Sequence, residues 1–287
     1  MSVLHTPLCV RNSRRGFTLV ELLVVIGIIA LLISILLPAL AAARSDGAST
    51  ASLSNLRQLS IGLIMYKNDF KGSYPPSSSP SSQKPRTRWA DAIFPYMRNT
   101  AVYMSPLLTD DEKVRMNKPF AHTCDPTTGN PIDGETIYWG GYGYNYQYLG
   151  NSRTPGGVAP YHAKDKAIKA SQTVAIADTH GSKNGGADWT SEGVYVIDPP
   201  LMSITLGSRG SRKSSAAPGG GQYGYTGGSD GDPAHRATPA ERNRGKVNAV
   251  FCDGHAESMK LKQLDDFNND GKPDNGWWNG KADANQR

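Results

Sequence analysis

An uncharged run of 22 residues, from Leu22 to Ala43, constrains this chain more than any other feature of its sequence. The run consists mostly of Leu, Ile, Val and Ala. At about 1.5 Å per residue, a helix of this length measures roughly 33 Å, which is enough to cross the hydrocarbon core of a bilayer. Basic residues precede the run, as expected for a cytoplasmic flank on its N-terminal side. The sequence therefore predicts a membrane-spanning helix near the N-terminus.

Three kinds of N-terminal segment share this pattern: a signal peptide, a plain membrane anchor, and a helix that survives removal of a short basic leader. Ala41–Ala43 would suit signal-peptide cleavage, and Pro38 could break the helix before it. Glu21 favours the surviving helix, because a carboxylate at the edge of lipid is costly without a partner. Cleavage between Gly16 and Phe17 would create an α-amine, which is largely cationic at neutral pH because its pKa is about 7.7–8.0. In a bundle of identical helices, Glu21 could neutralise the neighbour's amine and set the axial register.

The eight residues from Arg14 to Glu21, RRGFTLVE, resemble the prepilin cleavage and methylation motif of type IV pilins and type II secretion pseudopilins. The shared features are a glycine before the cut, a phenylalanine after it, a glutamate four residues on, and then an unbroken apolar helix. The resemblance implies that a prepilin peptidase cuts after Gly16 and N-methylates Phe17, and that Glu21 supports subunit addition. Pro38 falls 21 residues beyond Phe17, where many pilins kink their first helix.

The same resemblance implies a fold, a location and partners. The expected fold is α+β and pilin-like, with a long N-terminal α-helix packed on a small antiparallel β-sheet with long loops. Residues 1–16 would be the leader, 17–44 the transmembrane and assembly helix, 45–71 its amphipathic continuation, and 72–287 the exported globular head. The chain would cross the inner membrane once, with its head in the periplasm or outside the cell. After processing by the peptidase it would polymerise with identical or different pilin-like subunits.

Apolar residues at spacings of three and four extend the helical pattern beyond the uncharged run. Charged residues fall between them, so one face of the helix is apolar. We expect this face to pack on the sheet, and the helix to end near Lys71 and Gly72, where the glycine can supply a C-terminal cap. The apolar positions are Leu53, Leu56, Leu59, Leu63 and Tyr66.

The first part of the predicted head is rich in loop signals. Residues 72–88 are Pro/Ser-rich and predict an exposed loop. The segment Trp89–Met97 predicts a short helix that Pro95 would stop. Residues 105–135 contain turn-forming residues and no clear period, so we expect a loop excursion there.

Three later segments predict strands, because they are rich in aromatic or β-branched residues. Another loop is expected at 207–245, which is rich in Gly, Ser and Arg. It contains a formal G-x-G-x-x-G match at Gly219–Gly224, but no strand precedes the match and no apolar helix follows, which argues against a nucleotide site. The predicted strands are Thr136–Leu149, Ser171–Asp178 and Gly193–Asp198.

The segment 245–259 gives the strongest hairpin signal, with Asp253 and Gly254 suited to a two-residue turn that requires positive φ. It resembles the C-terminal motif of a large bacterial family of prepilin-like proteins, in which a histidine precedes an Asp-Gly pair by nine intervening residues. Asp253, Gly254 and His255 match the end of that motif. Asn243 stands where the histidine of the motif would be.

Near the C-terminus, the segment 266–277 has oxygen-bearing side chains at positions 1, 3, 5 and 9, and Gly271 at position 6. This is the spacing of a calcium loop, in which alternate residues of a tight turn point at one hard cation. Position 12, normally a bidentate Glu, is Trp277, so the segment is more similar to the loops of extracellular calcium modules than to a sensor EF-hand. It predicts calcium binding in the weak range of about 10⁻⁴–10⁻³ M, with a solvated acidic turn as the alternative. The candidate ligands are Asp266, Asn268, Asp270 and Asp274, with the backbone carbonyl of Lys272.

The chain has three cysteines, of which Cys9 lies in the predicted leader. Loss of the leader would leave Cys124 and Cys252 as an even pair. An exported chain could join them in a disulfide, and the alternative is two separate buried thiols.

Charge and motifs exclude several functions. The formal net charge is +6, and removing residues 1–16, which hold three arginines and no acid, leaves +3. The basic character is thus partly a property of the leader. Without a basic helical stripe or interleaved aromatic and basic residues, no nucleic-acid partner is predicted. No G-x-S-x-G, H-E-x-x-H or paired C-x-x-C motif indicates an enzyme. We therefore expect a structural filament subunit. The first alternative is a surface or periplasmic binding module tethered by a pilin-type helix, and a further one is a secreted calcium-dependent enzyme.

Overall fold

The computed structural model describes residues 19–80, 82–151, 161–184, 188–190, 195–200 and 237–286. The chain divides into two compact units, residues 1–44 and 45–287. The α-helices are α1 (Leu19–Asp69), α2 (Trp89–Met97), α3 (Asp110–Arg115), α4 (Tyr146–Leu149) and α5 (Leu261–Leu264). Short 3₁₀ turns are η1 (Thr100–Tyr103), η2 (Ala121–Thr123), η3 (Asp165–Ala167) and η4 (Ala170–Gln172). The strands are β1 (Asn117–Pro119), β2 (Tyr138–Gly140), β3 (Tyr142–Tyr144), β4 (Gly150–Asn151), β5 (Tyr161–His162), β6 (Val174–Asn184), β7 (Asp188–Thr190), β8 (Thr238–Pro239), β9 (Lys246–Phe251) and β10 (Ala256–Lys260).

The second part of α1, residues 45–69, belongs to the second unit and is called here the head-bound half. The helix ends in a Schellman-type cap, in which the backbone N–H of Gly72 donates to the carbonyl of Lys67 at 2.7 Å. Lys71 and Gly72 have φ values of 54° and 78°, so both adopt the left-handed conformation. The predicted end of the helix is thereby confirmed. The predicted apolar face is also confirmed, since its members are buried (Leu56, Leu59, Leu63) or partly buried (Leu53, Tyr66).

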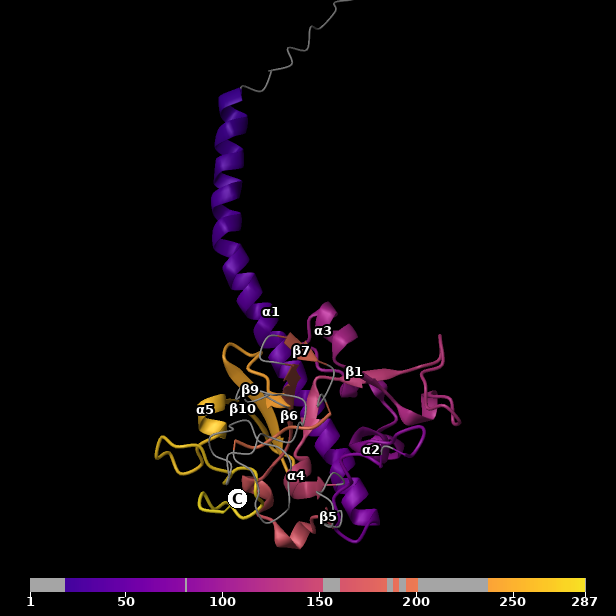
Figure 1. The fold of residues 1–287 in the computed structure, drawn as a ribbon. Helices are drawn as coiled ribbons and strands as arrows, with labels where there is room; N and C mark the ends of the chain where they lie inside the picture. The colour runs from indigo at the N-terminus through magenta and orange to yellow at the C-terminus, as the bar shows by residue number, and fades with distance from the viewer. Residues whose placement is uncertain are drawn as a thin grey trace, which may run out of the picture. The chain divides into compact units, whose positions relative to one another are not determined.

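The main sheet of the head has the strand order β10-β9-β6-β3, and each neighbouring pair is antiparallel. Figure 1 shows β6, β9 and β10 of this sheet. Strands β7 and β8 also pair with β6. The head-bound half of α1 and one face of this sheet share a single hydrophobic core, which includes Leu59, Ile176 and Val250. A long N-terminal helix packed on antiparallel strands is the α+β, pilin-like arrangement that the sequence predicted.

The C-terminal segment covers the other face of the sheet. Val247, Ala249 and Phe251 of β9 pack in a second core with Leu264 and Trp278. The indole Nε1 of Trp278 donates to the carbonyl of Leu264 at 3.1 Å. This hydrogen bond joins the two ends of the C-terminal segment, residues 264–278, where it packs on the strands. Strand β9 is therefore buried on both faces, because alternate residues face the helix and the C-terminal segment.

Several predicted boundaries need correction. Helix α2 runs two residues past Pro95, because the loss of one N–H donor near the end of a nine-residue helix does not unfold its last turn. The aromatic segment Thr136–Leu149 is split into β2, β3 and the short helix α4. In the third predicted strand, the described part contains an isolated parallel bridge between Val196 and Tyr144. The expected loop at 105–135 contains α3, β1 and η2, while most of the loop at 207–245, including Gly219–Gly224, lies outside the described residues.

The hairpin at 245–259 is confirmed as β9 and β10, but its turn differs from the prediction. The backbone N–H of Gly254 donates to the carbonyl of Phe251, and the N–H of Phe251 donates to the carbonyl of His255. The connection is thus a three-residue loop in which Gly254, with φ of 99°, takes the positive-φ position. The two-residue turn lies before β9, at Arg244 and Gly245, both of which have positive φ.

Candidate functional site: the N-terminal helix and the contacts of its head-bound half

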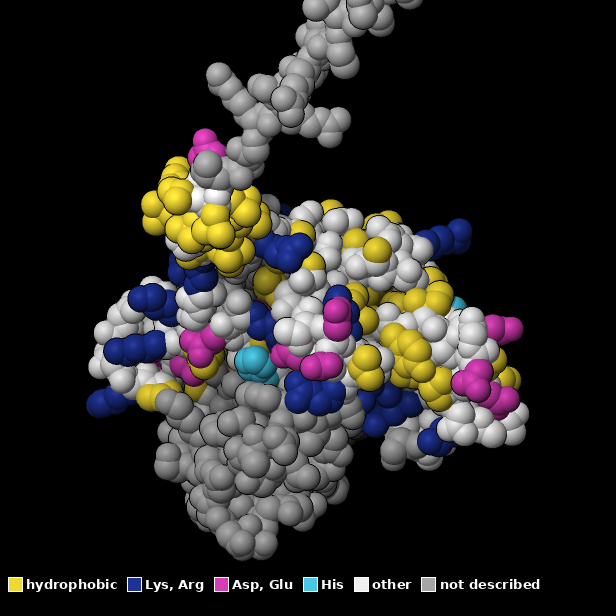
Figure 2. Space-filling model, turned by 90° about the horizontal axis from the view of Figure 1, so that it is seen from above, with side chains coloured by type: hydrophobic (Ala, Val, Ile, Leu, Met, Phe, Trp, Pro, Cys, Tyr) yellow, Lys and Arg dark blue, Asp and Glu magenta, His cyan; other side chains and the backbone are white. Residues whose placement is uncertain are grey.

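The first part of α1 presents large apolar side chains on all sides. From Leu19 to Leu40 these side chains are between 45% and 79% exposed, and Figure 2 shows them around the helix viewed along its length. In the described part of the chain, α1 is the one helix long and apolar enough to cross a membrane, by length and composition. A helix that is apolar all round in this way is suited to lipid or to the interior of a helix bundle.

Glu21 lies in the first described turn of α1, and Pro38 lies inside the helix. An acidic side chain in the first turn interacts favourably with the positive end of the helix dipole. Pro38 has no N–H, so the carbonyl of Ser34 lacks its usual helical donor. Gly16 and Phe17, the predicted cleavage and methylation positions, lie outside the described residues.

The head-bound half of α1 carries polar side chains on its buried face. Ser49, Ser52, Ser60 and Lys67 are all less than 9% exposed. The amine of Lys67 lies 2.5 Å from Asp165 Oδ1 and donates to the hydroxyl of Tyr74 at 3.1 Å. These contacts add directional constraints to the apolar packing, because buried polar groups are costly unless hydrogen-bonded.

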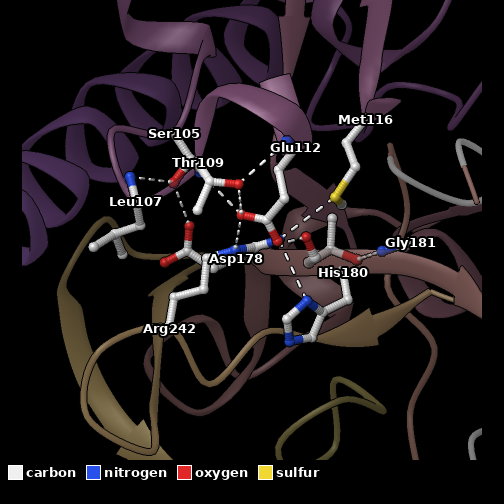
Figure 3. A network of polar contacts seen from close by, with 10 residues as sticks. Ser105, Leu107, Thr109, Glu112, Met116, Asp178, His180, Gly181 and Arg242 are labelled. Carbon is white, nitrogen blue, oxygen red and sulfur yellow. Dashed lines mark hydrogen bonds and ion pairs between the residues drawn. The ribbon is translucent and has the colours of Figure 1, made fainter. Parts of the chain in front are cut away.

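Asp178 of β6 accepts one such contact from the helix, and Figure 3 shows its contact with Ser105. It is fully buried. Ser105 Oγ donates to its Oδ1 at 2.8 Å, and Ser52 Oγ of α1 donates to its Oδ2 at 3.3 Å. Burial raises the pKa of Asp178 to about 6, although the charge of Arg242 and the hydrogen bonds from Ser105, Ser52 and the backbone of Asn248 act in the opposite direction. The carboxyl group therefore joins the helix, the sheet and the loop after η1.

Arg242 extends this network toward α3 (Figure 3). Its Nη2 lies 3.0 Å from Glu112 Oε1, and the side chains of the pair are 7% and 15% exposed, respectively. Its Nη1 donates to the carbonyl of Thr179 at 2.9 Å. Burial acts to raise the pKa of Glu112, but the hydrogen bond and charge of Arg242, the backbone hydrogen bond of Thr109 and the charge of His180 together lower it. Glu112 also accepts from the backbone N–H of Thr109, so the ion pair fixes the start of α3.

Asn243, the position where the resembled motif has histidine, begins the two-residue turn before β9. Its Nδ2 donates to Ser258 Oγ at 3.2 Å, and Ser258 in turn donates to Oδ1 of Asn248. Asn248 Nδ2 donates to Ser49 Oγ of α1 at 3.2 Å. A chain of side-chain hydrogen bonds thus runs from the motif position, across β10 and β9, to the head-bound half.

The Asp-Gly-His end of the motif lies at the other end of β9. Asp253 Oδ1 accepts from the backbone N–H of His255 at 3.1 Å and lies 2.6 Å from its Nδ1, while the imidazole stacks on Phe251. A Cβ added to Gly254 would lie 3.3 Å from Ser60 Oγ of α1. The nine residues between Asn243 and Asp253 therefore span one strand. The Asn243 end of the motif connects to α1 at Ser49, and the Gly254 end lies near Ser60.

The predicted calcium loop is folded by its own carboxylates. Asp266 accepts from the backbone N–H groups of Asp270 and Gly271, at 3.0 and 2.9 Å. Asp274 accepts from the N–H of Phe267 at 2.9 Å, and Asp270 from that of Lys272 at 2.8 Å. Within the described residues, no three Asp, Glu, His or Cys side chains converge as metal ligands. The structure brings Asp266, Asn268, Asp270 and Asp274 into one turn, and calcium binding stays a prediction.

Cys124 and Cys252 are two separate buried thiols. The thiol of Cys124 donates to the carbonyl of Phe120, in the region of η2. Burial raises the pKa of Cys252 to about 12, against a hydrogen bond from Tyr74 and the charge of Lys67 that act to lower it. The disulfide considered from the sequence is absent from this structure.

Sequence reasoning missed the polar residues on the buried helix face, although a signal was present. Stepping back from Leu56 by four and then three residues reaches Ser52 and Ser49, and stepping forward from Leu63 by four reaches Lys67. The leucine period, continued through polar residues, identifies the side chains that must find partners in the head.

Comparison with known proteins supports the N-terminal assignment. A family model described as the prokaryotic N-terminal methylation motif matches residues 11–37. No curated protein and no solved structure matches the chain. The C-terminal resemblance around Asp253–His255 stays a prediction. The N-terminal motif supports a type IV pilin-like precursor, and together with the apolar part of α1 it fits a protein anchored in a membrane by a single helix.

Proposed function

We propose that this chain is a structural subunit of a type IV pilus-like filament or a type II secretion pseudopilus. In this proposal a prepilin peptidase cuts after Gly16 and N-methylates Phe17. The observation that carries it is the match to the methylation motif at residues 11–37, which includes most of a helix segment with exposed apolar side chains on all sides. A signal peptide is cleaved off, so it has no need for a motif that places Glu21 four residues beyond the cut.

The proposed assembly exchanges lipid contacts for contacts between helices. Before assembly the apolar segment lies in the inner membrane, with the head in the periplasm or outside the cell. In the filament, identical or different pilin-like subunits surround the segment instead. Glu21 of one subunit then faces the α-amine of Phe17 in the next, and this charge pair fixes the axial register of the bundle.

The contacts of the head-bound half suit this role. A subunit drawn from the membrane into a filament must keep its head attached while force acts on its helix. Buried leucines and the hydrogen bonds of Ser49, Ser52 and Lys67 hold residues 45–69 in the head. Sliding the helix along the sheet would leave several buried polar groups without partners, which is strongly unfavourable.

A variant of Glu21 tests assembly separately from insertion. Glu21→Gln removes the charge at nearly the same size, and Asp46→Asn removes a charge from an exposed position of the same helix. We expect Glu21→Gln to insert into membranes normally but to enter sheared filaments at a small fraction of the normal level. Asp46→Asn should behave like the natural chain. Normal assembly of Glu21→Gln would contradict the role of Glu21, and absence of the natural chain from sheared filaments would favour the tethered binding module instead.

Mass spectrometry of membrane-extracted protein tests the processing. The proposal expects a chain that begins with N-methyl-Phe17 and retains the apolar segment. A mature chain that begins at Arg44 or Ser45 would instead identify a signal peptide and would overturn the filament role.

A further inference from the structure

The head contains a pocket of about 290 Å³ that is lined by cationic side chains. Lys84, Arg86 and Arg88 line it together with Pro119, Cys124 and Gly129. No acidic residue is among its described lining residues. We call this the basic pocket. A pocket of this size suits a small ligand or the end group of a larger one.

The backbone before α2 fixes two of the three cations. The N–H of Ser79 donates to the carbonyl of Thr87 at 2.8 Å, and Ser78 forms an antiparallel bridge with Arg88. The guanidinium of Arg86 donates to the carbonyl of Ser79 at 3.1 Å and to the hydroxyl of Ser78 at 2.8 Å. The basic pocket is therefore built on a paired stretch of chain, and the guanidinium of Arg86 is held in place.

The carboxylate of the nearby Asp91 accepts hydrogen bonds from backbone N–H groups. Asp91 Oδ2 accepts from the backbone N–H of Arg88 at 2.7 Å, and its Oδ1 accepts from the backbone N–H of Ala121 at 2.6 Å. Among the described residues, the side chains of Lys84 and Arg88 form no salt bridge. The guanidinium of Arg88 lies 5.3 Å from the ring centre of Tyr195, and its Nη1 donates to the carbonyl of Arg86 at 3.4 Å. Its buried Nε has no hydrogen-bond partner among the described residues. A buried donor left without an acceptor is unfavourable, so the guanidinium of Arg88 has an unmet need for one.

The electrostatics agree with this need. Burial lowers the pKa of Arg88; the charges of Tyr195 and Asp91 oppose that change, whereas Arg86 adds to it. Burial also raises the pKa of the Cys124 thiol, with Asp91 adding to the rise and Arg88 acting against it. The thiol is therefore neutral at physiological pH and does not supply a counter-charge.

We propose that the basic pocket binds an oxyanionic group of the phosphate or sulfate type, either as a free ion or as the end group of a larger molecule. Guanidinium groups match such oxyanions well, since their planar donors contact two oxygens at once, and a lysine adds a point charge. The group would accept from Arg88 and approach Lys84 at the pocket mouth. This binding does not depend on filament assembly, so it stands whether or not the proposed function holds.

Binding can be measured on the full chain in a non-ionic detergent. The probes are inorganic phosphate, sulfate and glycerol phosphate, each compared with sodium chloride at equal ionic strength. We expect a saturable rise in the thermal unfolding midpoint with the oxyanions and no matching rise with chloride. Tighter binding of glycerol phosphate would indicate the end group of a larger molecule, and tighter binding of inorganic phosphate would indicate a free ion.

Two variants assign the binding to the basic pocket. Lys84→Gln changes an exposed side chain and should weaken binding about fivefold without unfolding the protein. Arg88→Lys keeps the charge but loses the fork of donors, and should weaken binding by about tenfold or more. Lys246→Gln removes an exposed charge on β9 and should bind like the natural chain. The proposal would be overturned if the oxyanions raised the unfolding midpoint of the natural chain no more than chloride does. It would also be overturned if the oxyanions raised the midpoints of Lys84→Gln, Arg88→Lys and Lys246→Gln equally.

Discussion

Ser52 of α1 and Asp178 of β6 lie 126 positions apart in the sequence, yet Ser52 Oγ is 3.3 Å from Asp178 Oδ2, and both residues are completely buried. The contact joins the helix that carries the apolar segment to the central strand of the head. Tyr142 donates to the same serine hydroxyl at 3.2 Å, so Ser52 is held from both sides. Because a displaced helix would leave Asp178 without this donor, the contact also fixes the position of the helix along the sheet.

Removing the serine hydroxyl should therefore destabilise the head. We expect Ser52→Ala to lower the free energy of unfolding by about 1–2 kcal/mol, because Asp178 loses a buried donor and Tyr142 loses its acceptor. Ser54→Ala, on the exposed side of the same helix, is the control and should change stability little. Urea unfolding followed by tryptophan fluorescence measures both. Equal stability of the two variants would show that the Ser52 contact is unimportant.

The buried carboxyl of Asp178 should give the head an unusual pH dependence. Its pKa is raised from 3.8 to about 6. The folded state binds a proton at Asp178 more tightly than the unfolded chain does. Protonation of Asp178 therefore adds to the free energy of unfolding, fully below about pH 4, and this contribution is lost as pH rises through 6. We expect Asp178→Asn to gain stability relative to the natural chain by about 3 kcal/mol between pH 4 and 7. Asp111→Asn, at an exposed acid, should parallel the natural chain, and a parallel profile for Asp178→Asn would contradict the prediction.

The ion pair between Arg242 and Glu112 should behave as a buried pair. Arg242→Gln leaves Glu112 without its counter-charge, and we expect a loss of about 3 kcal/mol at pH 7. The lowered pKa of Glu112 means that the pair stabilises the head above pH 4.5 and loses this effect as pH falls through the pKa of the folded state. The difference in free energy of unfolding between Arg242→Gln and the natural chain, measured by urea unfolding, should therefore become smaller as pH falls below 4.5.

A surface pair provides the comparison for that measurement. Arg244 and Asp46 lie 3.1 Å apart, with side chains more than half exposed. Arg244→Gln should cost less than about 1 kcal/mol, because exposed pairs are screened by solvent. Similar losses for Arg242→Gln and Arg244→Gln would refute the distinction between them.

Gly254 should be less replaceable than Gly245. Both have positive φ, at 99° and 75°, so alanine is strained at either position. A Cβ at Gly254 would also meet Ser60 Oγ at 3.3 Å, whereas one at Gly245 has nothing within 4 Å. We expect Gly245→Ala to lose about 1 kcal/mol and Gly254→Ala clearly more, by chemical denaturation. The opposite order would argue against close contact of the hairpin with α1.

The calcium prediction can be tested by ligand-induced stabilisation. If the loop binds calcium, a concentration 100 times its dissociation constant should stabilise the protein by about 2.7 kcal/mol, and chelation should remove the effect. Asp270→Asn should weaken it, whereas Glu257→Gln, at an exposed acid of β10, should not. An equal response to magnesium, or none to calcium, would leave the segment as a solvated turn.

The sequence alone determined the elements that depend on local patterns. The uncharged run from Leu22 to Ala43, the placement of Glu21 and the leucine period beyond Leu53 define α1, because helical hydrogen bonds join residues four positions apart. The same holds for the end of α1 at Lys71–Gly72 and for the hairpin of β9 and β10. Each of these was predicted from spacing or turn chemistry within a short window.

Only the tertiary structure decided which faces meet. It placed β9 between the helix and the C-terminal segment, brought Ser52 to Asp178, and separated Cys124 from Cys252. It also placed Pro119, Cys124 and Gly129 beside the cations of residues 84–88 around one pocket. These relationships join residues far apart in the chain, so no local period encodes them. They arise because a compact head must bury its apolar faces and satisfy every polar group buried with them, and both conditions hold only for the folded chain as a whole.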